Sequence, residues 1–243
     1  TSSSTGIVDF VSEADFLADL ADSLQRKVSE MGAHEVSVAF QVFSPVSYAV
    51  PKLLPSVAEK AFDLANELSP KQLTHTLQGL SRSQLAAPEL LSALKGRAQQ
   101  LSHVLFGTHA VTALVSLADS EQLDEKILQT LLDTILRHLD RLSSQDYIAV
   151  LSTISRLPAS FRSALPVSCV EEIMQALRSR GYGPWRLEVE AVVHLLEALH
   201  GLRQEDEVLL ELVLDRLPAA LQLSDLSLTL LLRLMESLAE LPK

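Results

Sequence analysis

The side chains that could carry chemistry in this chain of 243 residues are few and far apart. Its single cysteine, Cys169, could act as a nucleophile or a redox centre, but one thiol cannot form an internal disulfide. No cluster of cysteines is present that could bind zinc. A lone cysteine on an amphipathic helix is usually a small core residue. We therefore expect Cys169 to be structural.

The seven histidines and the acidic pairs offer no better reaction centre. None of the histidines belongs to an HExxH motif, and His194 and His200 are six residues apart, on different sides of a helix. Glu188 and Glu190 stand where a helix should begin, and the helix dipole explains their placement. The chain contains no glycine-rich phosphate loop, GxSxG motif or Walker lysine. The sequence predicts a protein that is not an enzyme, with no cofactor, metal or small-molecule substrate.

Basic residues that could contact phosphate groups gather in one part of the chain. Lys71, Arg82, Lys95 and Arg97 are the candidate RNA contacts, because lysine and arginine supply most of the affinity for nucleic acid. The chain as a whole has the opposite balance, with 31 acidic residues, 20 lysines and arginines and a formal net charge of −11. A solvated helix face is the alternative explanation of these four residues.

The elements that position these residues repeat along the chain. Leu73, Leu77 and Leu80 have the i, i+4, i+7 spacing of one helix face, and a similar triplet recurs at intervals of 37 residues, then of 45 and 39. We call the helix that carries the triplet the first helix of a repeat. The six triplets are Val36/Phe40/Phe43, Leu73/Leu77/Leu80, Ala110/Leu114/Leu117, Tyr147/Leu151/Ile154, Val192/Leu196/Leu199 and Leu231/Met235/Leu238.

A second helix lies between consecutive triplets. Leu17, Leu54, Leu91 and Leu128 are each 37 residues apart, and neighbouring apolar positions follow the same step. Each repeat is therefore a helical hairpin, and the sequence predicts an all-α fold, an α-solenoid of stacked helical hairpin repeats of about 37 residues. We expect an N-terminal half unit with a second-type helix at 1–33, regular repeats at 34–160, and irregular repeats with an insertion and a C-terminal half unit at 161–243.

Residues typical of helix starts and ends agree with this division into repeats. Serine, aspartate, glutamate and proline stand where helices should start, and glycine where second helices should end. The predicted starts are Ser69-Pro70, Pro88-Glu89, Asp124-Glu125, Ser143 to Asp146, Glu205 to Glu207 and Ser224-Asp225, and the predicted ends are Gly32, Gly107 and Gly181. The longer step before Val192 predicts an extended turn from Pro158 to Pro166 and a loop from Gly181 to Pro184.

Apolar residues at the two ends of the array are candidates for protein contact, because no further repeat covers them here. This candidate interface comprises Leu17, Leu20 and Leu24, Leu230, Leu234 and Leu238, and the only tryptophan, Trp185, whose alternative role is packing between repeats. The half units at the ends predict either partner proteins that cover them or a longer parent chain. A mean hydropathy of +0.21 agrees with an excess of apolar surface, but no run of about 20 apolar residues predicts a membrane span.

The repeats are similar to a known class. The segment from Leu68 to Arg82, followed by Pro88 to Leu94, resembles the octatricopeptide and heptatricopeptide repeats of organellar RNA-metabolism proteins, including those that carry a RAP domain. Residues 142–157 match about as well, and the resemblance covers residues 34 to 160. No RAP domain is evident after the last repeat. The resemblance implies an organellar protein that holds single-stranded RNA along its first helices.

The charge of the chain modifies that expectation. Positions equivalent to His75 and Gln78 in the other repeats form neither a basic stripe nor an aromatic ladder, and Glu197 and Glu236 on the later first helices would repel phosphate. We therefore predict a non-catalytic scaffold subunit of a large organellar ribonucleoprotein assembly, first of all the mitochondrial ribosome, which holds other protein subunits and RNA through the early repeats. The alternatives are an accessory structural subunit of a mitochondrial respiratory or ATP synthase complex and a free organellar RNA-processing factor. The predicted location is the mitochondrion, with the plastid as alternative.

Overall fold

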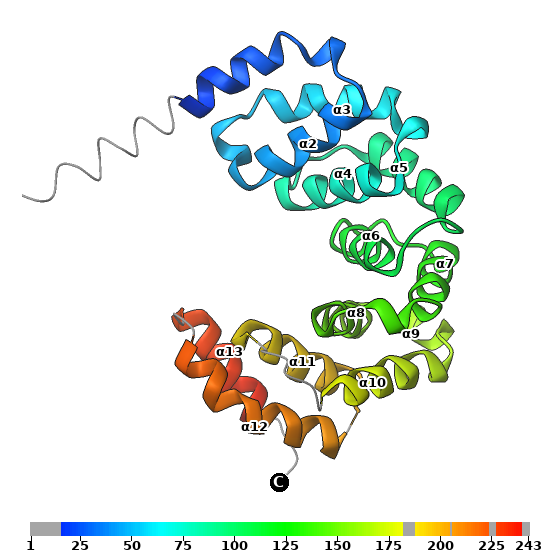
Figure 1. Ribbon diagram of the computed structural model, residues 1–243, viewed down its shortest axis with the longest axis vertical. Coiled ribbons are helices and arrows are strands. Elements are labelled where there is room, and N and C mark those ends of the chain that lie inside the picture. The colour runs from blue at the N-terminus through cyan, green and yellow to red at the C-terminus, as the bar shows by residue number, and fades with distance from the viewer. Residues whose placement is uncertain (1–15, 182–187, 205, 224–226, 240–243) are drawn as a thin grey trace, which may run out of the picture. The chain divides into compact units, whose positions relative to one another are not determined.

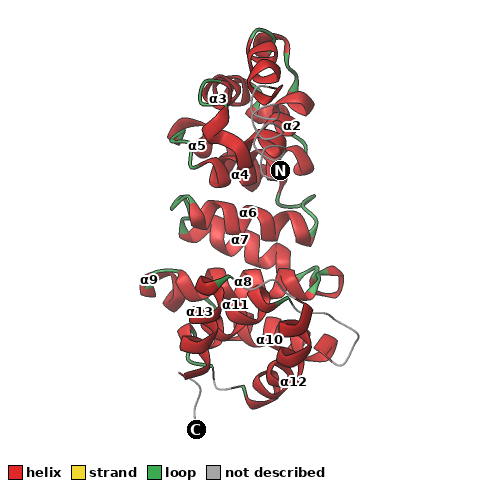
Figure 2. Cartoon of the chain, turned by 90° about the vertical axis from the view of Figure 1, so that its left-hand side faces the viewer, coloured by secondary structure: helices red, strands yellow, loops and turns green. Residues whose placement is uncertain are grey.

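A computed structural model describes residues 16–181, 188–204, 206–223 and 227–239, and its regular structure there is helical, with no strand in these ranges (Figure 1, Figure 2). The first helices are α2 (Ala33–Phe43), α4 (Pro70–Ser83), α6 (Gly107–Asp119), α8 (Ser144–Arg156), α11 (Val189–Gly201) and α13 (Leu228–Ala239). The second helices are α3 (Leu53–Asp63), α5 (Pro88–Leu101), α7 (Glu125–Leu136), α10 (Val167–Gly181) and α12 (Glu207–Leu223), and residues 16–25 form a further helix before them. The predicted all-α helical repeat fold is confirmed.

Short elements complete the chain between these helices. The six-residue helix α9 (Ala159–Ala164) separates α8 from α10, and 3₁₀ turns follow or precede several helices. These turns are η1 (Val28–Glu30), η2 (Ser44–Ala49), η3 (Ala65–Glu67) and η4 (Leu139–Arg141).

Most predicted helix starts coincide with real N-caps. Ser69 precedes α4, Pro70 is its first residue, and the Gln72 side chain accepts a hydrogen bond from the Ser69 amide at 2.9 Å. At α8 the hydroxyl of Ser143 accepts from the Asp146 amide at 3.2 Å, and the Asp146 carboxylate accepts from the Ser143 amide at 2.8 Å. Each contact satisfies an amide that the helix leaves without a partner.

The chain divides into two compact units, and in each one like helices pack together (Figure 1). In the unit formed by residues 16–105 and 119–127, α2 packs along α4, while α3 contacts α2 and α5. In the other unit, α11 lies between α8 and α13, and α10 contacts α8 and α12. Packing of first helices on first helices is the arrangement that a stack of hairpin repeats requires.

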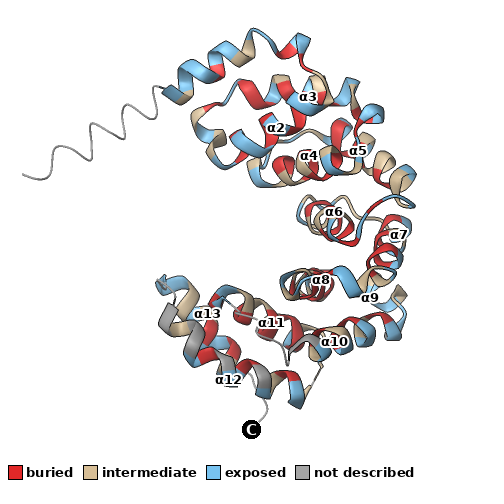
Figure 3. Ribbon diagram, in the orientation of Figure 1, coloured by how far each residue is buried: buried red, intermediate tan, exposed pale blue. Residues whose placement is uncertain are grey.

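The repeated apolar positions form the core of both units, as the buried segments in Figure 3 indicate. Leu77, Leu114 and Leu151 occupy equivalent positions on three first helices, and all three side chains are fully buried. Their burial was expected from the 37-residue period and is confirmed. Val57 and Leu94 occupy equivalent positions on two second helices, and their side chains are also fully buried.

The last triplet was assigned one residue too far along the chain. Met235 is 66% exposed, whereas Leu234 and Ser237 are buried, so the face of α13 that packs inward follows Leu230, Leu234 and Ser237. Ser237 is tolerated inside because its hydroxyl donates to the Arg233 carbonyl at 2.8 Å. Leucines at four of the five positions from 230 to 234 made several registers equally apolar, and packing against α11 selects one of them.

The predicted glycine terminators Gly32 and Gly107 are helix starts instead. Gly32 is the extended N-cap residue of α2, and Gly107 is the first residue of α6. In the described residues every left-handed backbone conformation falls on another residue type, at Gln84, Glu121 and Arg203, each just after a first helix. The prediction failed because it placed the left-handed turn after the wrong helix of the hairpin.

The insertion before α11 differs from the predicted extended turn. Residues 159–164 form α9, because Pro158 supplies the carbonyl to which the amides of Phe161 and Arg162 donate. Gly181 ends α10, but the predicted loop up to Pro184 and the start at Ser224-Asp225 lie outside the described residues. Ser227 caps α13, since its hydroxyl accepts from the Leu230 amide at 3.2 Å.

Candidate interaction surfaces

The four basic residues predicted to contact RNA do not form one cluster. Lys71 stands in the first turn of α4 and Arg82 in its last, so that along the helix axis they are about 16 Å apart. Both side chains are exposed. α4 therefore offers phosphate groups two separate cations rather than a continuous patch.

Lys95 and Arg97 on α5 are largely occupied by the chain itself. The Lys95 ammonium lies 3.0 Å from the Asp124 carboxylate, in the segment before α7. Arg97 donates to the Leu68 carbonyl at 3.0 Å and to the side chain of Gln100 at 3.1 Å. Both cations tie neighbouring segments of the first compact unit together, which leaves less of their charge for a nucleic acid.

The outward positions of α4 and α8 carry a single charged side chain, Lys71. On α4 they are Lys71, His75 and Gln78, and on α8 the equivalents are Gln145, Ala149 and Ser152. Polar and small side chains at these positions can form hydrogen bonds with a partner, but they provide no aromatic ladder for stacking bases.

The acidic repulsion expected on the later first helices is weaker than the sequence suggested. The Glu197 carboxylate of α11 pairs with both ends of the Arg233 guanidinium of α13, at 2.9 and 2.7 Å. This bidentate pair cancels the charge of Glu197 and fixes the two helices in register. The pair also holds the pKa of the Arg233 guanidinium above its usual value. Glu236 is exposed on the same helix.

With the corrected register, α13 presents an apolar face at the outward positions. Leu228, Leu232 and Met235 are 74%, 52% and 66% exposed and follow one another at i, i+4 and i+7. In α11 the equivalent residues are Glu190, His194 and Glu197. The i, i+4, i+7 spacing of these apolar residues is visible in the sequence, but α13 has so many leucines that the sequence alone does not show which of them face outward.

The interface residues predicted near the C-terminal end are only partly accessible. Leu234 is buried, while Leu230 and Leu238 are half-buried. The accessible apolar surface of α13 is instead the face of Leu228, Leu232 and Met235.

Two of the three residues of the predicted N-terminal interface, Leu20 and Leu24, line a groove. Leu20 is 37% exposed, and Leu17 and Leu24 are half-buried in the helix of residues 16–25. Together with Val38 and Val42 on α2, Leu20 and Leu24 border a groove of about 480 Å³. Trp185 lies outside the described residues.

No reaction centre is visible in the described part of the chain. Cys169 is 1% exposed, and burial together with the negative charges of Glu172 and Asp133 raises the pKa of its thiol to about 11. Among the described residues, no group of three histidine, cysteine, aspartate or glutamate side chains is placed to hold a metal ion. None of the described helices combines the length and the apolar character needed to cross a bilayer.

Comparison with known protein families assigns the chain to one of them. The sequence profile of the RNA-editing substrate-binding complex 6 protein family matches residues 11–181, well over half of the 243 residues. The chain belongs to this family. The matched range includes the regular repeats, from α2 to α10. No curated protein sequence matches the chain at a significant level.

The RNA-editing substrate-binding complex 6 family is a more specific assignment than the resemblance to octatricopeptide and heptatricopeptide repeats. Both point to helical proteins associated with RNA, but the matching profile is that of a component of an RNA-editing complex. The octatricopeptide and heptatricopeptide assignment itself stays a prediction.

Proposed function

We propose that this chain is a non-catalytic scaffold subunit of a mitochondrial ribonucleoprotein assembly, of the RNA-editing kind named by its family. The observation that carries the proposal is the family match over residues 11–181. In this role the stacked hairpins hold neighbouring protein subunits, and RNA contact is confined to the early repeats.

Charge and exposed apolar surface support a role based mainly on protein contacts. A net charge of −11 disfavours extensive contact with phosphate groups. Lys95 and Arg97, half of the candidate basic residues, already bind Asp124, Leu68 and Gln100 within the chain. The apolar face of α13, with Leu228, Leu232 and Met235, suits a contact with a neighbouring subunit, since such faces are rare on isolated soluble proteins.

The mitochondrial ribosome is the second candidate assembly. It combines protein and RNA contacts in the same way, and the polar, weakly charged outward positions of α4 and α8 are compatible with a subunit in either assembly. The two assemblies differ in their companions, so the composition of the purified complex distinguishes them.

The test is sedimentation of the tagged chain from mitochondrial extracts, followed by identification of its companions with and without ribonuclease. We expect the chain in a large complex with RNA-editing proteins, and we expect protein contacts to persist after ribonuclease treatment. Ribosomal proteins as companions would establish the second candidate. A chain that sediments alone, or with a respiratory or ATP synthase complex, would overturn the proposal.

A matched pair of variants makes the test sharper. Leu232→Glu with Met235→Glu places charge in the apolar face of α13, whereas Thr229→Glu with Ala239→Glu adds the same charge at other exposed positions of that helix. The first variant should lose companions that the control keeps. Equal behaviour of the two variants would exclude this face as a contact.

A further inference from the structure

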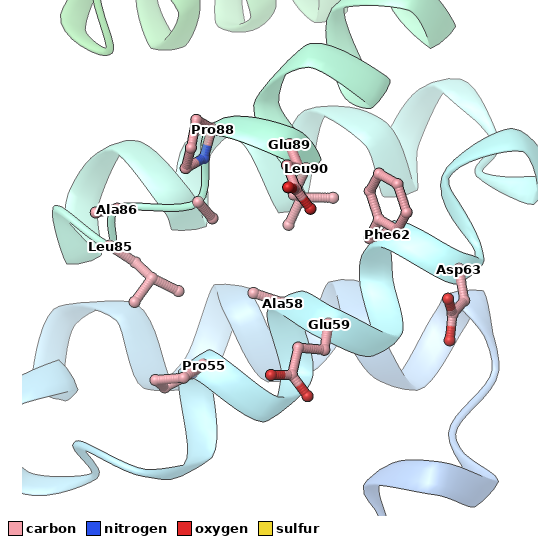
Figure 4. A pocket seen from close by; sticks show the side chains of 11 residues that line it. Pro55, Ala58, Glu59, Phe62, Asp63, Leu85, Ala86, Pro88, Glu89 and Leu90 are labelled. Atoms are coloured by element: carbon pink, nitrogen blue, oxygen red, sulfur yellow. The ribbon is translucent and has the colours of Figure 1, made fainter.

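A groove of about 470 Å³ lies between α3 and the segment that leads into α5 (Figure 4). Pro55 and Leu85 stand at one end of it, and Phe62 and Asp63 stand at the other. Ala58, Glu59, Glu89 and Leu90 lie between them. The groove belongs entirely to the first compact unit.

The lining of this groove is apolar and acidic. Glu59, Asp63 and Glu89 contribute three carboxylates, and none of the described residues that line the groove is basic. Phe62 is 47% exposed, a large fraction for phenylalanine, which is among the residue types most often buried. The groove therefore combines apolar contact area with three negative charges and no basic lining residue.

The next repeat shows how the chain itself fills the equivalent position. Ala87 is the N-cap residue of α5, and its counterpart before α7 is Asp124, which accepts from the Ile127 amide at 2.9 Å. Ala58 on α3 corresponds, 37 residues on, to Lys95 on α5. There the Lys95 ammonium reaches across to Asp124 at 3.0 Å.

A third copy of this arrangement occurs in the second compact unit. Asp206 caps α12 through the Leu209 amide at 3.1 Å, and the guanidinium of Arg178 on α10 lies 2.8 Å from its carboxylate. The buried positions Cys169, Ile173 and Leu177 align α10 with α3, and by that alignment Arg178 takes the place of Phe62. A cation of the chain thus lies between second helix and N-cap in both of these copies.

We propose that the groove between α3 and α5 binds an arginine-bearing, otherwise apolar peptide segment of a partner protein. In the two other copies an internal lysine or arginine pairs with an aspartate N-cap. This copy has Ala58 in place of Lys95, Phe62 in place of Arg178, and Ala87 in place of the aspartate. Its three carboxylates then receive a cation from outside the chain. This inference rests on the proposed scaffold function and names the chemistry of one partner.

The dimensions and the aromatic ring favour arginine in an extended segment. Pro55 and Asp63 are eight residues apart on α3, or about 12 Å, which matches three to four residues of extended chain. A planar guanidinium can stack on the exposed face of Phe62 while it donates to Glu59 or Glu89, which a lysine ammonium cannot do in the same way. Apolar neighbours of the arginine would cover Leu85 and Pro55.

The test measures binding of defined peptides to the purified 243-residue chain by fluorescence anisotropy. The probe is a labelled peptide of alternating leucine and arginine, six residues long, and the comparison peptides replace arginine by glutamate or leucine by glycine. We expect the leucine–arginine peptide to bind and each comparison peptide to bind at least about tenfold more weakly. Salt should weaken the binding, since the carboxylates are exposed to solvent.

Variants locate the binding site. Glu59→Gln with Asp63→Asn and Glu89→Gln should weaken the peptide at least about tenfold, and Phe62→Ala alone should weaken it severalfold. The matched control, Asp19→Asn with Asp22→Asn and Glu67→Gln, removes the same charge from exposed positions outside the groove and should bind as the parent chain does. Circular dichroism checks that each variant is folded.

Three outcomes would overturn the inference. They are no binding of the leucine–arginine peptide, equal binding by the groove variant and the control variant, and displacement of the peptide from the groove by an oligouridylate probe, which would indicate a nucleic-acid site. Peptide binding needs no RNA and no assembly, so it can succeed while the sedimentation experiment fails, and the reverse is equally observable.

Discussion

At the scale of single residues, the buried thiol of Cys169 gives a direct test of the second compact unit. At pH 8, a thiol with a pKa of about 11 contains about one hundredth as much thiolate as a thiol with the ordinary pKa of 9.0. Only the thiolate is alkylated. Iodoacetamide should therefore react at least about 100-fold more slowly with the folded chain than with the chain in denaturant. As the pH rises from 9 towards 11, unfolding should become easier, because the unfolded chain loses this proton first.

The control for this reaction is a Cys169→Ser chain that carries Ser92→Cys at an exposed position of α5. It should react at the same rate folded and unfolded. A native Cys169 that reacts as fast as this exposed cysteine would contradict the buried assignment.

Residue-level features were predictable where they follow from local chemistry. Ser143 and Asp124 cap helices because their side chains accept from amides three residues on, and before α4 the Gln72 side chain accepts from the Ser69 amide. These signals are visible in the sequence. The left-handed conformation of Gln84 was not predictable, because glycine or asparagine is the usual residue at such a helix end and glutamine gives no such signal.

At the scale of elements, two glycines inside helices should respond in opposite ways to the same change. A Cβ atom at Gly79 of α4 would lie 2.5 Å from the Phe40 Cβ atom and 3.0 Å from the Phe40 carbonyl, because α2 and α4 approach closely there. We expect Gly79→Ala to destabilise the chain by about 1–3 kcal/mol. At Gly96 of α5 nothing lies within 4 Å, so Gly96→Ala should stabilise it by up to about 1 kcal/mol.

Urea unfolding followed by circular dichroism measures both variants, and Gly96→Ala serves as the control for helix propensity. Equal shifts of the two midpoints would show that α2 and α4 do not approach as described.

The contact between Lys95 of α5 and Asp124 should depend on pH. The Ile127 amide, and then the Lys95 ammonium, hold the pKa of Asp124 below its ordinary value of 3.8 against the opposing effect of burial. A lowered carboxyl pKa contributes stability above the pKa of the unfolded chain and loses it as the pH falls through the folded value. Asp124→Asn keeps the N-cap, so it should cost only about 0.2–1 kcal/mol at pH 7, and less below pH 3.8.

Lys95→Met provides the matched partner in a double-mutant cycle, measured by urea unfolding at neutral and at acidic pH. A coupling between the two positions that is the same at both pH values would mean that the ion pair does not stabilise the chain.

The registers of elements were predictable to the extent that the apolar pattern was unique. Leu73, Leu77 and Leu80 stand out among polar neighbours, and their period located α4 correctly. In α13 leucine occurs on every side, and only the contact with α11 decides that Leu234 is buried and Leu232 exposed. The groove beside Phe62 could be recognised only after the caps Ala87, Asp124 and Asp206 had aligned the repeats.

At the scale of the whole molecule, the net charge and the family lead to different expectations about RNA contact. A protein of an RNA-editing complex family would be expected to contact RNA, yet a net charge of −11 repels phosphate over a Debye length of about 10 Å in ordinary buffers. An acidic scaffold satisfies both expectations if basic partner proteins bind the RNA and the scaffold binds those partners. The acidic groove beside Phe62 is consistent with that arrangement.

The free chain should therefore bind single-stranded RNA weakly. Lys71 and Arg82 are the exposed cations among the four candidates, so Lys71→Gln with Arg82→Gln should reduce what binding there is, whereas Lys52→Gln with Arg26→Gln, also exposed, should not. Two phosphate contacts predict a slope of about −1.4 in a plot of log affinity against log salt for the parent chain. Anisotropy titrations with oligouridylate at several salt concentrations give both quantities. Tight binding near physiological salt that both double variants retain would mean that RNA is held by polar outward positions such as Gln78 and Ser152, and that the chain itself, rather than a basic partner, reads the RNA.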